Sequence, residues 1–314
     1  MKDIRIVFMG TPDFAVTILK HLVENKYTVV GVVTAADKPA GRGRKLNESA
    51  VKKYAQSQNL TVLQPTNLKN EEFHKELKTL HANLQIVVAF RMLPKIVWQM
   101  PQFGTFNLHA SLLPAYRGAA PIHWAVINGE TKTGATTFFI DDKIDTGEII
   151  LQEEIAIKTT ETVGSLHDKL MFLGANLVAK TVNLIAEGSI KTTKQPELEE
   201  KLAPKLNPEN TKINWSTSLD TIYDKIRGLN PFPVAWTLIL NGGIEVSAKI
   251  YEVQKEKENH KYEVGKIITS KKEIKVAVNN GFIIINEIKL AGKKKMSAQS
   301  LLNGFTFSEN ARML

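Results

Sequence analysis

The sequence contains no cysteine, which excludes disulfide bonds, thiolate zinc sites and a cysteine nucleophile, and which favours a reducing compartment. It also lacks any run of about 18 apolar residues of the kind that crosses a membrane. The amino end passes from Met1-Lys2-Asp3 directly into the segment IRIVFMG, which is too short and wrongly flanked for a secretory signal and is predicted to be a strand. We therefore expect a cytoplasmic protein that has no membrane partner.

Acidic residues are comparatively scarce, because 32 Asp and Glu stand against 41 Lys and Arg and the formal net charge is +9. Such an excess attracts polyanions or simply keeps a protein soluble. The basic residues are concentrated in two places, since residues 37–53 contain six basic and two acidic residues and residues 249–314 contain thirteen and seven. Nucleic-acid binding is therefore one open hypothesis.

The 314 residues are sufficient for about two domains. Over residues 1–189, short β-branched runs alternate with helical patterns, which predicts a Rossmann-like α/β domain with a mostly parallel sheet. Thr11 is predicted to cap the first helix, with Pro12 as its first residue, and a long helix is expected over residues 163–187. The turn GTPDFA has one glycine where the dinucleotide fingerprint needs three, so NAD binding is not expected.

The remainder of the chain has a different pattern. Residues 190–206 are polar and interrupted by proline, which predicts a linker. Residues 207–314 contain short alternating runs, with a hairpin signal at Asn279-Asn280-Gly281, and predict a small C-terminal β-barrel of OB-like type. The expected organisation is a catalytic domain (1–189), a linker (190–206) and a β-barrel domain (207–314).

The segment NLHASLLPAYRGAAPIHW, residues 107–124, places two polar side chains at the end of an apolar strand. Asn107 and His109 are two residues apart and share a face, near the carboxyl end of a strand where open α/β sheets bind ligands. The alternative is a polar pair that merely closes the end of the sheet. After it come an apolar wall with a proline, a cation on the turn Arg117-Gly118, and a helix that starts at Pro121.

Asp145, in the loop DDKIDTG, could reach the histidine or could be a solvated loop acid. An Asn, a His and an Asp without a serine or cysteine nucleophile suggest chemistry in which the substrate brings the nucleophile. In acyl transfer to an amine, Asn107 would donate a hydrogen bond to the oxyanion, and His109 would move the proton. Asp145 would orient the imidazole and stabilise its charged form.

Four segments carry a resemblance to a known family: NLHASLLPAYRGAAPI, DTGEI, RIVFMGTPDFA and KPAGRGRKL. Together they resemble the methionyl-tRNA formyltransferases, within the formyltransferases that use 10-formyltetrahydrofolate, and the match runs through the whole chain. The resemblance implies that Asn107, His109 and Asp145 are catalytic. It further implies that formyl passes from the folate co-substrate to the amino group of methionyl initiator tRNA, with no metal and no nucleotide cofactor. The folate-binding residues that it implies are Phe90, Arg91, Met92, Leu93, Ser111, Leu112, Leu113, Pro114, Ile140 and Asp141.

The same resemblance assigns a role to the basic loop at residues 37–45, which would inspect the acceptor end of the tRNA. A flexible cationic loop suits this task, because a rigid helix cannot enter the deep, narrow groove of A-form RNA. Arg42 is expected to make the main contact, and the C-terminal barrel, with Lys293-Lys294-Lys295, would track the RNA backbone. The tRNA-binding residues implied are Lys38, Arg42, Arg44, Lys45 and Lys205. Two positions differ from the family pattern, namely Tyr116 before the arginine and the absence of glycine in NPENTKINW. We expect a monomer.

Three alternatives remain at this point. A related formyltransferase that acts on an amino sugar nucleotide or on glycinamide ribonucleotide would share the three catalytic residues, but it would need neither the basic loop nor the basic barrel. A non-catalytic RNA-binding protein on the same scaffold would not need the three residues. A formyl-folate hydrolase would use water in place of the amine.

Overall fold

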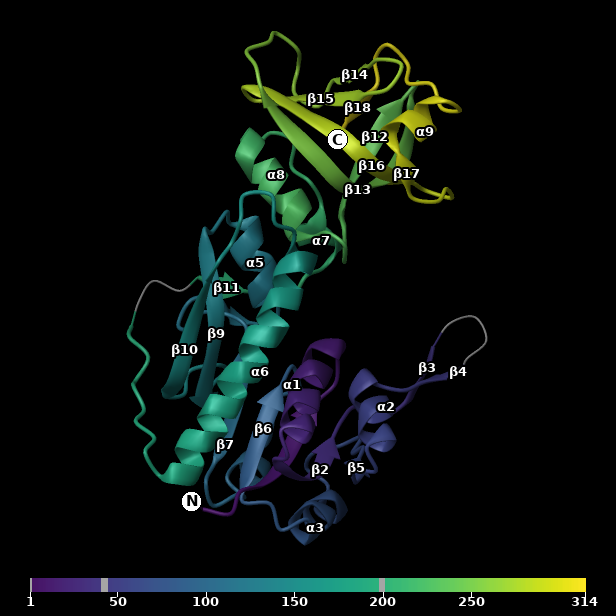
Figure 1. Cartoon of the computed structure of the whole chain (residues 1–314). Helices are drawn as coiled ribbons and strands as arrows, with labels where there is room; N and C mark the ends of the chain where they lie inside the picture. The colour runs from purple at the N-terminus through teal and green to yellow at the C-terminus, as the bar shows by residue number, and fades with distance from the viewer. Residues whose placement is uncertain (1, 41–44, 198–200) are drawn as a thin grey trace. The chain divides into compact units, whose positions relative to one another are not determined.

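The computed structural model describes residues 2–40, 45–197 and 201–314, and the chain divides into two compact units (Figure 1). The first unit comprises Met1–Pro121, Thr133–Ile155 and His167–Leu202. The second comprises Ile122–Lys132, Ala156–Leu166 and Ala203–Leu314. This division follows contacts within each unit, and the boundaries 1–189, 190–206 and 207–314 stay a prediction.

A seven-stranded sheet with the order β10-β9-β7-β6-β1-β2-β5 forms the centre of the first unit. Its strands are β1 (Arg5–Gly10), β2 (Thr28–Val33), β5 (Val62–Leu63), β6 (Leu84–Val88), β7 (Thr105–His109), β9 (Lys132–Phe139) and β10 (Ile149–Ala156). The neighbours from β7 to β5 pair in parallel, and β7 pairs with β9 in antiparallel fashion. The prediction of a mostly parallel α/β sheet is confirmed.

The helices of this unit are α1 (Asp13–Glu24), α2 (Ala50–Ser57), α3 (Glu71–Thr79), α4 (Lys95–Trp98) and most of α6 (Val163–Glu187). Four short strands accompany them: β3 (Lys38–Ala40), β4 (Lys45–Asn47), β8 (Arg117–Gly118) and β11 (Leu202–Ala203). Helices α1 and α6 lie side by side in front of the sheet in Figure 1, and the Thr17 hydroxyl lies 3.4 Å from Met171 Sδ. One face of the sheet buries Val7, Met9 and Val87 in a cluster with Phe73 and Leu77 of α3.

The predicted start of α1 is wrong by one residue. The helix begins at Asp13, and Pro12 occupies the N-cap position with an extended ψ of 175°. The Pro12 carbonyl accepts the first helical hydrogen bonds, from the backbone N–H groups of Ala15 at 3.0 Å and Val16 at 3.3 Å. No side chain caps this end, so Thr11 does not have the predicted role.

Helix α6 begins and ends at the predicted residues. Within the described residues it is the single helix long and apolar enough to cross a membrane by length and composition, and half of that window is buried. Gly174 lies so close to β7 that a Cβ there would come within 2.7 Å of Leu108 Cδ2. The apolar face of α6 thus packs against the sheet of its own domain.

The second unit contains a nearly closed antiparallel barrel with the strand order β14-β15-β16-β13-β12-β18. Its strands are β12 (Ala235–Asn241), β13 (Ile244–Lys257), β14 (Ile267–Thr269), β15 (Ile274–Val278), β16 (Gly281–Leu290), β17 (Met296–Ser297) and β18 (Arg312–Met313). Hydrogen bonds from Ile267 N to Ala311 O (3.0 Å) and from Met313 N to Gly265 O (2.8 Å) join the two ends of the barrel. Asn280, with φ 62°, turns the predicted hairpin between β15 and β16.

The helices of the second unit are α5 (Pro121–Ile127), α7 (Pro208–Thr211), α8 (Leu219–Gly228) and α9 (Ala298–Leu302). Helix α8 buries Ile222 and Ile226 in the same apolar cluster as Ile239 and Ile283 of the barrel. Helix α5 begins at Pro121 as predicted. The barrel prediction is confirmed.

Candidate active site

The carboxyl end of β7 carries two of the predicted catalytic side chains. Asn107 lies opposite Val87 of β6 and Phe138 of β9, and His109 lies opposite Thr136. His109 is 6% exposed, whereas Asn107 is half-buried. Among the described residues the Asn107 side-chain amide has no hydrogen-bond partner, so its N–H groups are available to a ligand.

Both nitrogens of His109 face oxygen atoms. Nε2 lies 2.8 Å from the Tyr116 carbonyl, and Nδ1 lies 3.7 Å from Asp145 Oδ2. Because a carbonyl can only accept, this network assigns the proton of the neutral ring to Nε2 and the lone pair to Nδ1. The Asp145 carboxylate is 14% exposed and accepts a hydrogen bond from the Gly118 N–H at 2.9 Å. The structure thus brings Asp145 to His109, which the sequence left open.

Two residues that hold His109 have left-handed backbone conformations. Tyr116 has φ 62° and Asp145 has φ 55°. Such conformations are uncommon outside glycine, persist only where surrounding contacts enforce them, and gather at functional sites. The Asp145 turn is also tight, because a Cβ at Gly147 would come within 1.7 Å of the Phe139 carbonyl oxygen. In the sequence, Tyr116 is only a difference from the family pattern, and no sequence signal marks its carbonyl as a partner of His109.

The SLLP segment, Ser111–Pro114, is fixed by hydrogen bonds. Ser111 Oγ donates to the Ala115 carbonyl at 2.6 Å, and the Thr136 hydroxyl donates to the Ser111 carbonyl at 2.6 Å. Gln152 Nε2 donates to the Leu113 carbonyl at 2.9 Å. Ser111 and Leu113 are buried, whereas Leu112 and Pro114 are partly exposed. Leu112 and Pro114 are therefore the members of this segment that could touch a ligand.

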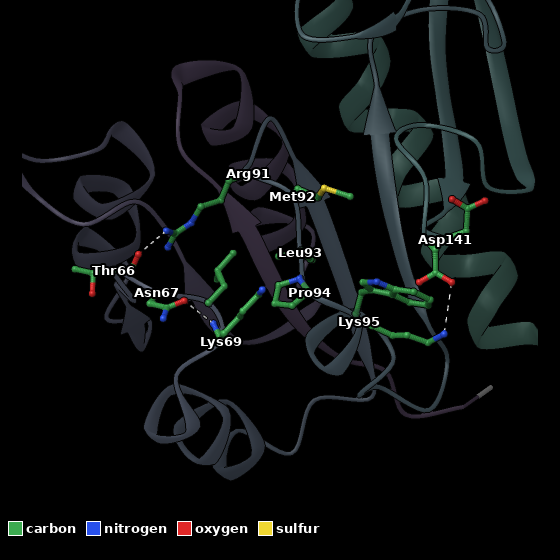
Figure 2. Close-up of a pocket in the computed structure, with 12 residues that line it drawn as sticks. Thr66, Asn67, Lys69, Arg91, Met92, Leu93, Pro94, Lys95 and Asp141 are labelled. Atoms are coloured by element: carbon green, nitrogen blue, oxygen red, sulfur yellow. Dashed lines mark hydrogen bonds and ion pairs between the residues drawn. The ribbon is translucent and has the colours of Figure 1, made fainter.

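A pocket of about 440 Å³ is formed by segments that follow β5, β6 and β9 (Figure 2). Its lining residues are Thr66, Asn67, Leu68, Lys69, Arg91, Met92, Leu93, Pro94, Lys95, Trp98, Asp141 and Asp142. Four of the predicted folate-binding residues are among them: Arg91, Met92, Leu93 and Asp141. Phe90 and Ile140 instead pack against the apolar cluster of the sheet, and the SLLP segment does not line this pocket.

The segment Thr66–Lys69 is the part of the pocket that sequence analysis missed. It follows β5 directly, and the carboxyl ends of parallel strands meet at one edge of a sheet. Figure 2 shows Thr66, Asn67 and Lys69 on one side of the segment Arg91–Lys95, with Asp141 on the other. The position of β5 was the available signal, but this strand has only two residues.

Charged groups surround the apolar side chains of the pocket, which are those of Met92, Leu93 and Trp98. Arg91 Nη1 donates to the Thr66 carbonyl at 3.0 Å, and burial lowers the pKa of Arg91 from its usual value, although it remains a cation. Lys95 Nζ lies 3.5 Å from Asp142 Oδ2. Asp141 accepts hydrogen bonds from the Thr146 hydroxyl at 2.7 and 2.9 Å, and so organises the loop that carries Asp145. Apolar side chains with cations beside them fit a flat aromatic molecule that carries carboxylates.

The predicted tRNA-binding residues are distributed over both units. Lys38 is exposed in β3, and Lys205 is exposed in the second unit, where its carbonyl accepts from Asn210 Nδ2 at 3.0 Å. Arg42 and Arg44 lie outside the described residues, as does the side chain of Lys45. Within residues 2–40, 45–197 and 201–314, no group of three or more histidine or acidic side chains is arranged to hold a metal ion.

The fold and the end of β7 define the class of the protein. Residues 4–182 match the family described as formyl transferase, and residues 205–306 match the formyl transferase C-terminal domain. The chain is 60% identical to methionyl-tRNA formyltransferase of Flavobacterium johnsoniae over the full length of both proteins, and 52% identical to that of Bacteroides thetaiotaomicron over 99% of each. The chain belongs to the methionyl-tRNA formyltransferase family, and its expected enzyme class is confirmed.

Solved structures show the same fold at low identity. The sugar 3N-formyl transferase WlaRD, crystallised with dTDP and 5-N-formyl-THF, aligns with a TM-score of 0.64 at 20% identity, covering 94% of this chain and all of that one. HypX from Aquifex aeolicus in complex with tetrahydrofolic acid aligns with a TM-score of 0.66 at 16% identity, covering 96% of this chain and 47% of that one. At these identities the likeness shows the fold alone.

Proposed function

We propose that this chain transfers the formyl group of 10-formyltetrahydrofolate to the α-amino group of methionine on initiator tRNA, in support of translation initiation. The observation that carries the proposal is the end of β7, where His109 lies between the Tyr116 carbonyl and Asp145 Oδ2 with the Asn107 amide on the same strand face. The acceptor is supported by the full-length similarity to methionyl-tRNA formyltransferases.

The three side chains divide the reaction between them. The Asn107 amide donates a hydrogen bond to the oxygen of the formyl group as that oxygen gains negative charge. His109 Nδ1 accepts the proton of the attacking amine, because Nε2 already donates to Tyr116. The 3.7 Å between Nδ1 and Asp145 exceeds a hydrogen bond, so Asp145 interacts strongly only with the imidazolium. The amine nitrogen forms a bond to the formyl carbon of the bound donor, and the bond from that carbon to N10 of the donor breaks. N10 then takes the proton that His109 received from the amine.

The folate co-substrate would be held in the pocket formed by the segments after β5, β6 and β9. Met92, Leu93 and Trp98 offer the pocket's apolar surface, and Lys69 and Lys95 offer cations to carboxylates. Leu112 and Pro114 of the SLLP segment follow His109 by only a few residues, and their partly exposed apolar side chains could also contact the co-substrate. This assignment keeps Arg91, Met92, Leu93 and Asp141 as folate contacts and gives Phe90, Ile140, Ser111 and Leu113 supporting roles.

The tRNA would be bound by exposed cations. Lys38 and Lys205 are exposed, and the loop with Arg42, Arg44 and Lys45 contributes the densest positive charge in the first unit. Contacts of this kind bind phosphates in a salt-dependent manner. The proposal also holds that the enzyme is cytoplasmic and monomeric, that it has no membrane partner and that it needs no metal.

An amino sugar nucleotide is the second candidate acceptor, because WlaRD, which shares the fold, is a sugar 3N-formyl transferase. The test is formyl transfer from 10-formyltetrahydrofolate to three acceptors: Met-charged initiator tRNA, Met-charged elongator tRNA and an amino sugar nucleotide. Selective formylation of the initiator tRNA is expected. Formylation of the sugar alone would retain the three catalytic residues and replace the acceptor, and transfer to none of them would overturn the proposed function.

A further inference from the structure

Gln195 lies in the segment after α6 that the sequence assigned to a linker, yet its side-chain amide is fully used. Its Oε1 accepts from Arg117 Nε at 3.1 Å and from Arg117 Nη2 at 2.7 Å. Its Nε2 donates to the carbonyls of Asp145 at 2.8 Å and Gly147 at 2.9 Å. An amide group has two donor hydrogens and two acceptor lone pairs, so all four positions are satisfied.

These partners belong to the two short segments that hold His109. The carbonyl of Tyr116, the neighbour of Arg117, binds Nε2 of the imidazole, and the carboxylate of Asp145 faces Nδ1. Both segments include a non-glycine residue in the left-handed region, which needs external contacts to persist. We infer that Gln195 is a positioning residue that joins these two segments and thereby sets the distance between His109 and Asp145.

The backbone beside Gln195 is anchored independently of its side chain. Thr193 and Ile149 exchange backbone hydrogen bonds, from Thr193 N to Ile149 O at 2.9 Å and from Ile149 N to Thr193 O at 2.8 Å. Gln195 itself is partly exposed, so an apolar replacement leaves no large cavity. Substitution at 195 therefore removes the four side-chain bonds while the segment stays in place.

The inference rests on the proposed function, and kinetics of the full-length enzyme test it. Gln195→Met has a similar length but cannot donate to the two carbonyls. Gln195→Glu retains an acceptor for Arg117 but sets a carboxylate oxygen against those carbonyls. We expect either change to lower kcat for formylation by about 10- to 100-fold, the scale of a misplaced catalytic group, with KM for the charged tRNA within about twofold. Gln58→Met, the same substitution at an exposed position on α2's C-cap, is the matched control.

A double-mutant cycle distinguishes positioning from general stability. In an Asp145→Ala background, Gln195→Met should cause a much smaller further loss of kcat, because the carboxylate that it positions is absent. A loss that multiplies fully with that of Asp145→Ala would overturn the inference. So would wild-type kcat in Gln195→Met, or thermal unfolding of both Gln195 variants at the assay temperature, which would assign Gln195 to stability. An inactive wild-type enzyme would instead overturn the proposed function.

Discussion

At the scale of single residues, the proposed mechanism depends on which nitrogen of His109 can accept a proton. The Tyr116 carbonyl occupies Nε2, and this leaves the lone pair on Nδ1, on the side of Asp145. The gain of a proton places an ion pair at one edge of a ring that is almost fully buried, where electrostatic interactions are stronger than in water. In the proposed reaction, the Asp145 carboxylate is thus the group that faces the positive charge that develops at Nδ1 during amine attack.

In the proposed mechanism, alanine at Asn107 or at His109 would remove one partner of the transition state. We expect kcat/KM for formylation to fall by at least about 100-fold in either variant, with little change in the thermal unfolding temperature. Steady-state formylation assays and thermal unfolding measure the two quantities. Asn25→Ala, at an exposed helix end, is the control, and near wild-type rates in either active-site variant would contradict the assigned roles.

Part of this site could be predicted from the sequence because it is local. Strand alternation alone places Asn107 and His109 on one face. The contacts of Gln195 could not be predicted, because they join residues 78 and 48–50 positions away in the sequence. The left-handed conformation of Asp145 is likewise enforced by distant contacts, and Asp has no strong intrinsic preference that would announce it.

At the scale of elements, an ion pair anchors the start of the β3–β4 hairpin. Asp37 Oδ2 lies 2.5 Å from Lys52 Nζ of α2, and Asp37 Oδ1 accepts from Gln64 Nε2 at 2.8 Å. The hydrogen bond from Lys52 is the main reason that the pKa of Asp37 is held below its usual value of 3.8, and the hydrogen bond to Asp37 raises the pKa of Lys52 above 10.5. The hairpin that carries the basic loop is thus fastened to α2 at neutral pH.

The pH dependence of the Asp37–Lys52 ion pair follows from the directions of its two pKa shifts. Because folding lowers the pKa of Asp37, its ionised carboxylate stabilises the fold at pH values above the pKa of the unfolded chain, near 3.8. This stability is lost as the pH falls through the lower pKa of the folded protein. Because folding raises the pKa of Lys52, its ammonium group stabilises the fold at pH values below 10.5, and this stability is lost as the pH rises through the higher pKa of the folded protein. Asp37→Asn should therefore lower the urea midpoint more at about pH 6 than at about pH 3. An equal difference at both values would contradict the assignment.

Helix α8 is joined to the segment before α6 by a buried cation. Arg227 is 7% exposed, its Nε donates to Asp224 at 2.7 Å, and its Nη1 donates to the Glu161 carbonyl at 2.8 Å. We expect Arg227→Met to lower the free energy of unfolding by about 3 kcal/mol, because Asp224 and this carbonyl lose their partner. Urea unfolding measures the change. Lys257→Met, at a side chain 76% exposed, should change it by less than about 0.5 kcal/mol, and equal effects would show that burial of Arg227 is unimportant.

Elements with a strong local pattern were predictable, and short ones were not. The 25 residues of α6 and the hairpin at Asn279-Asn280 follow from periodicity and turn preference. Strand β5 has two residues and α4 has four, lengths at which periodicity carries no signal. The pocket wall after β5 was missed for this reason.

At the scale of the whole molecule, the net charge of +9 would act on the tRNA and scarcely on the smaller co-substrate. Each phosphate neutralised by Lys or Arg releases counterions, so binding of tRNA should weaken steeply as salt increases. Donor binding in an apolar pocket should respond weakly. This difference allows a basic residue of the loop to be assigned to RNA without a bound structure.

Arg42→Ala is the sharpest test of that loop. If Arg42 contacts the acceptor end, kcat/KM for charged initiator tRNA should fall by about tenfold or more, and the slope of log binding constant against log salt should decrease by about 1. Hydrolysis of 10-formyltetrahydrofolate by water should be unchanged, because that reaction needs the end of β7 but no RNA. Lys20→Ala, which removes one positive charge on α1 beside Glu24, controls for net charge. An equal loss in formylation and hydrolysis would mean that the loop supports the active site generally, since only an RNA contact separates the two reactions.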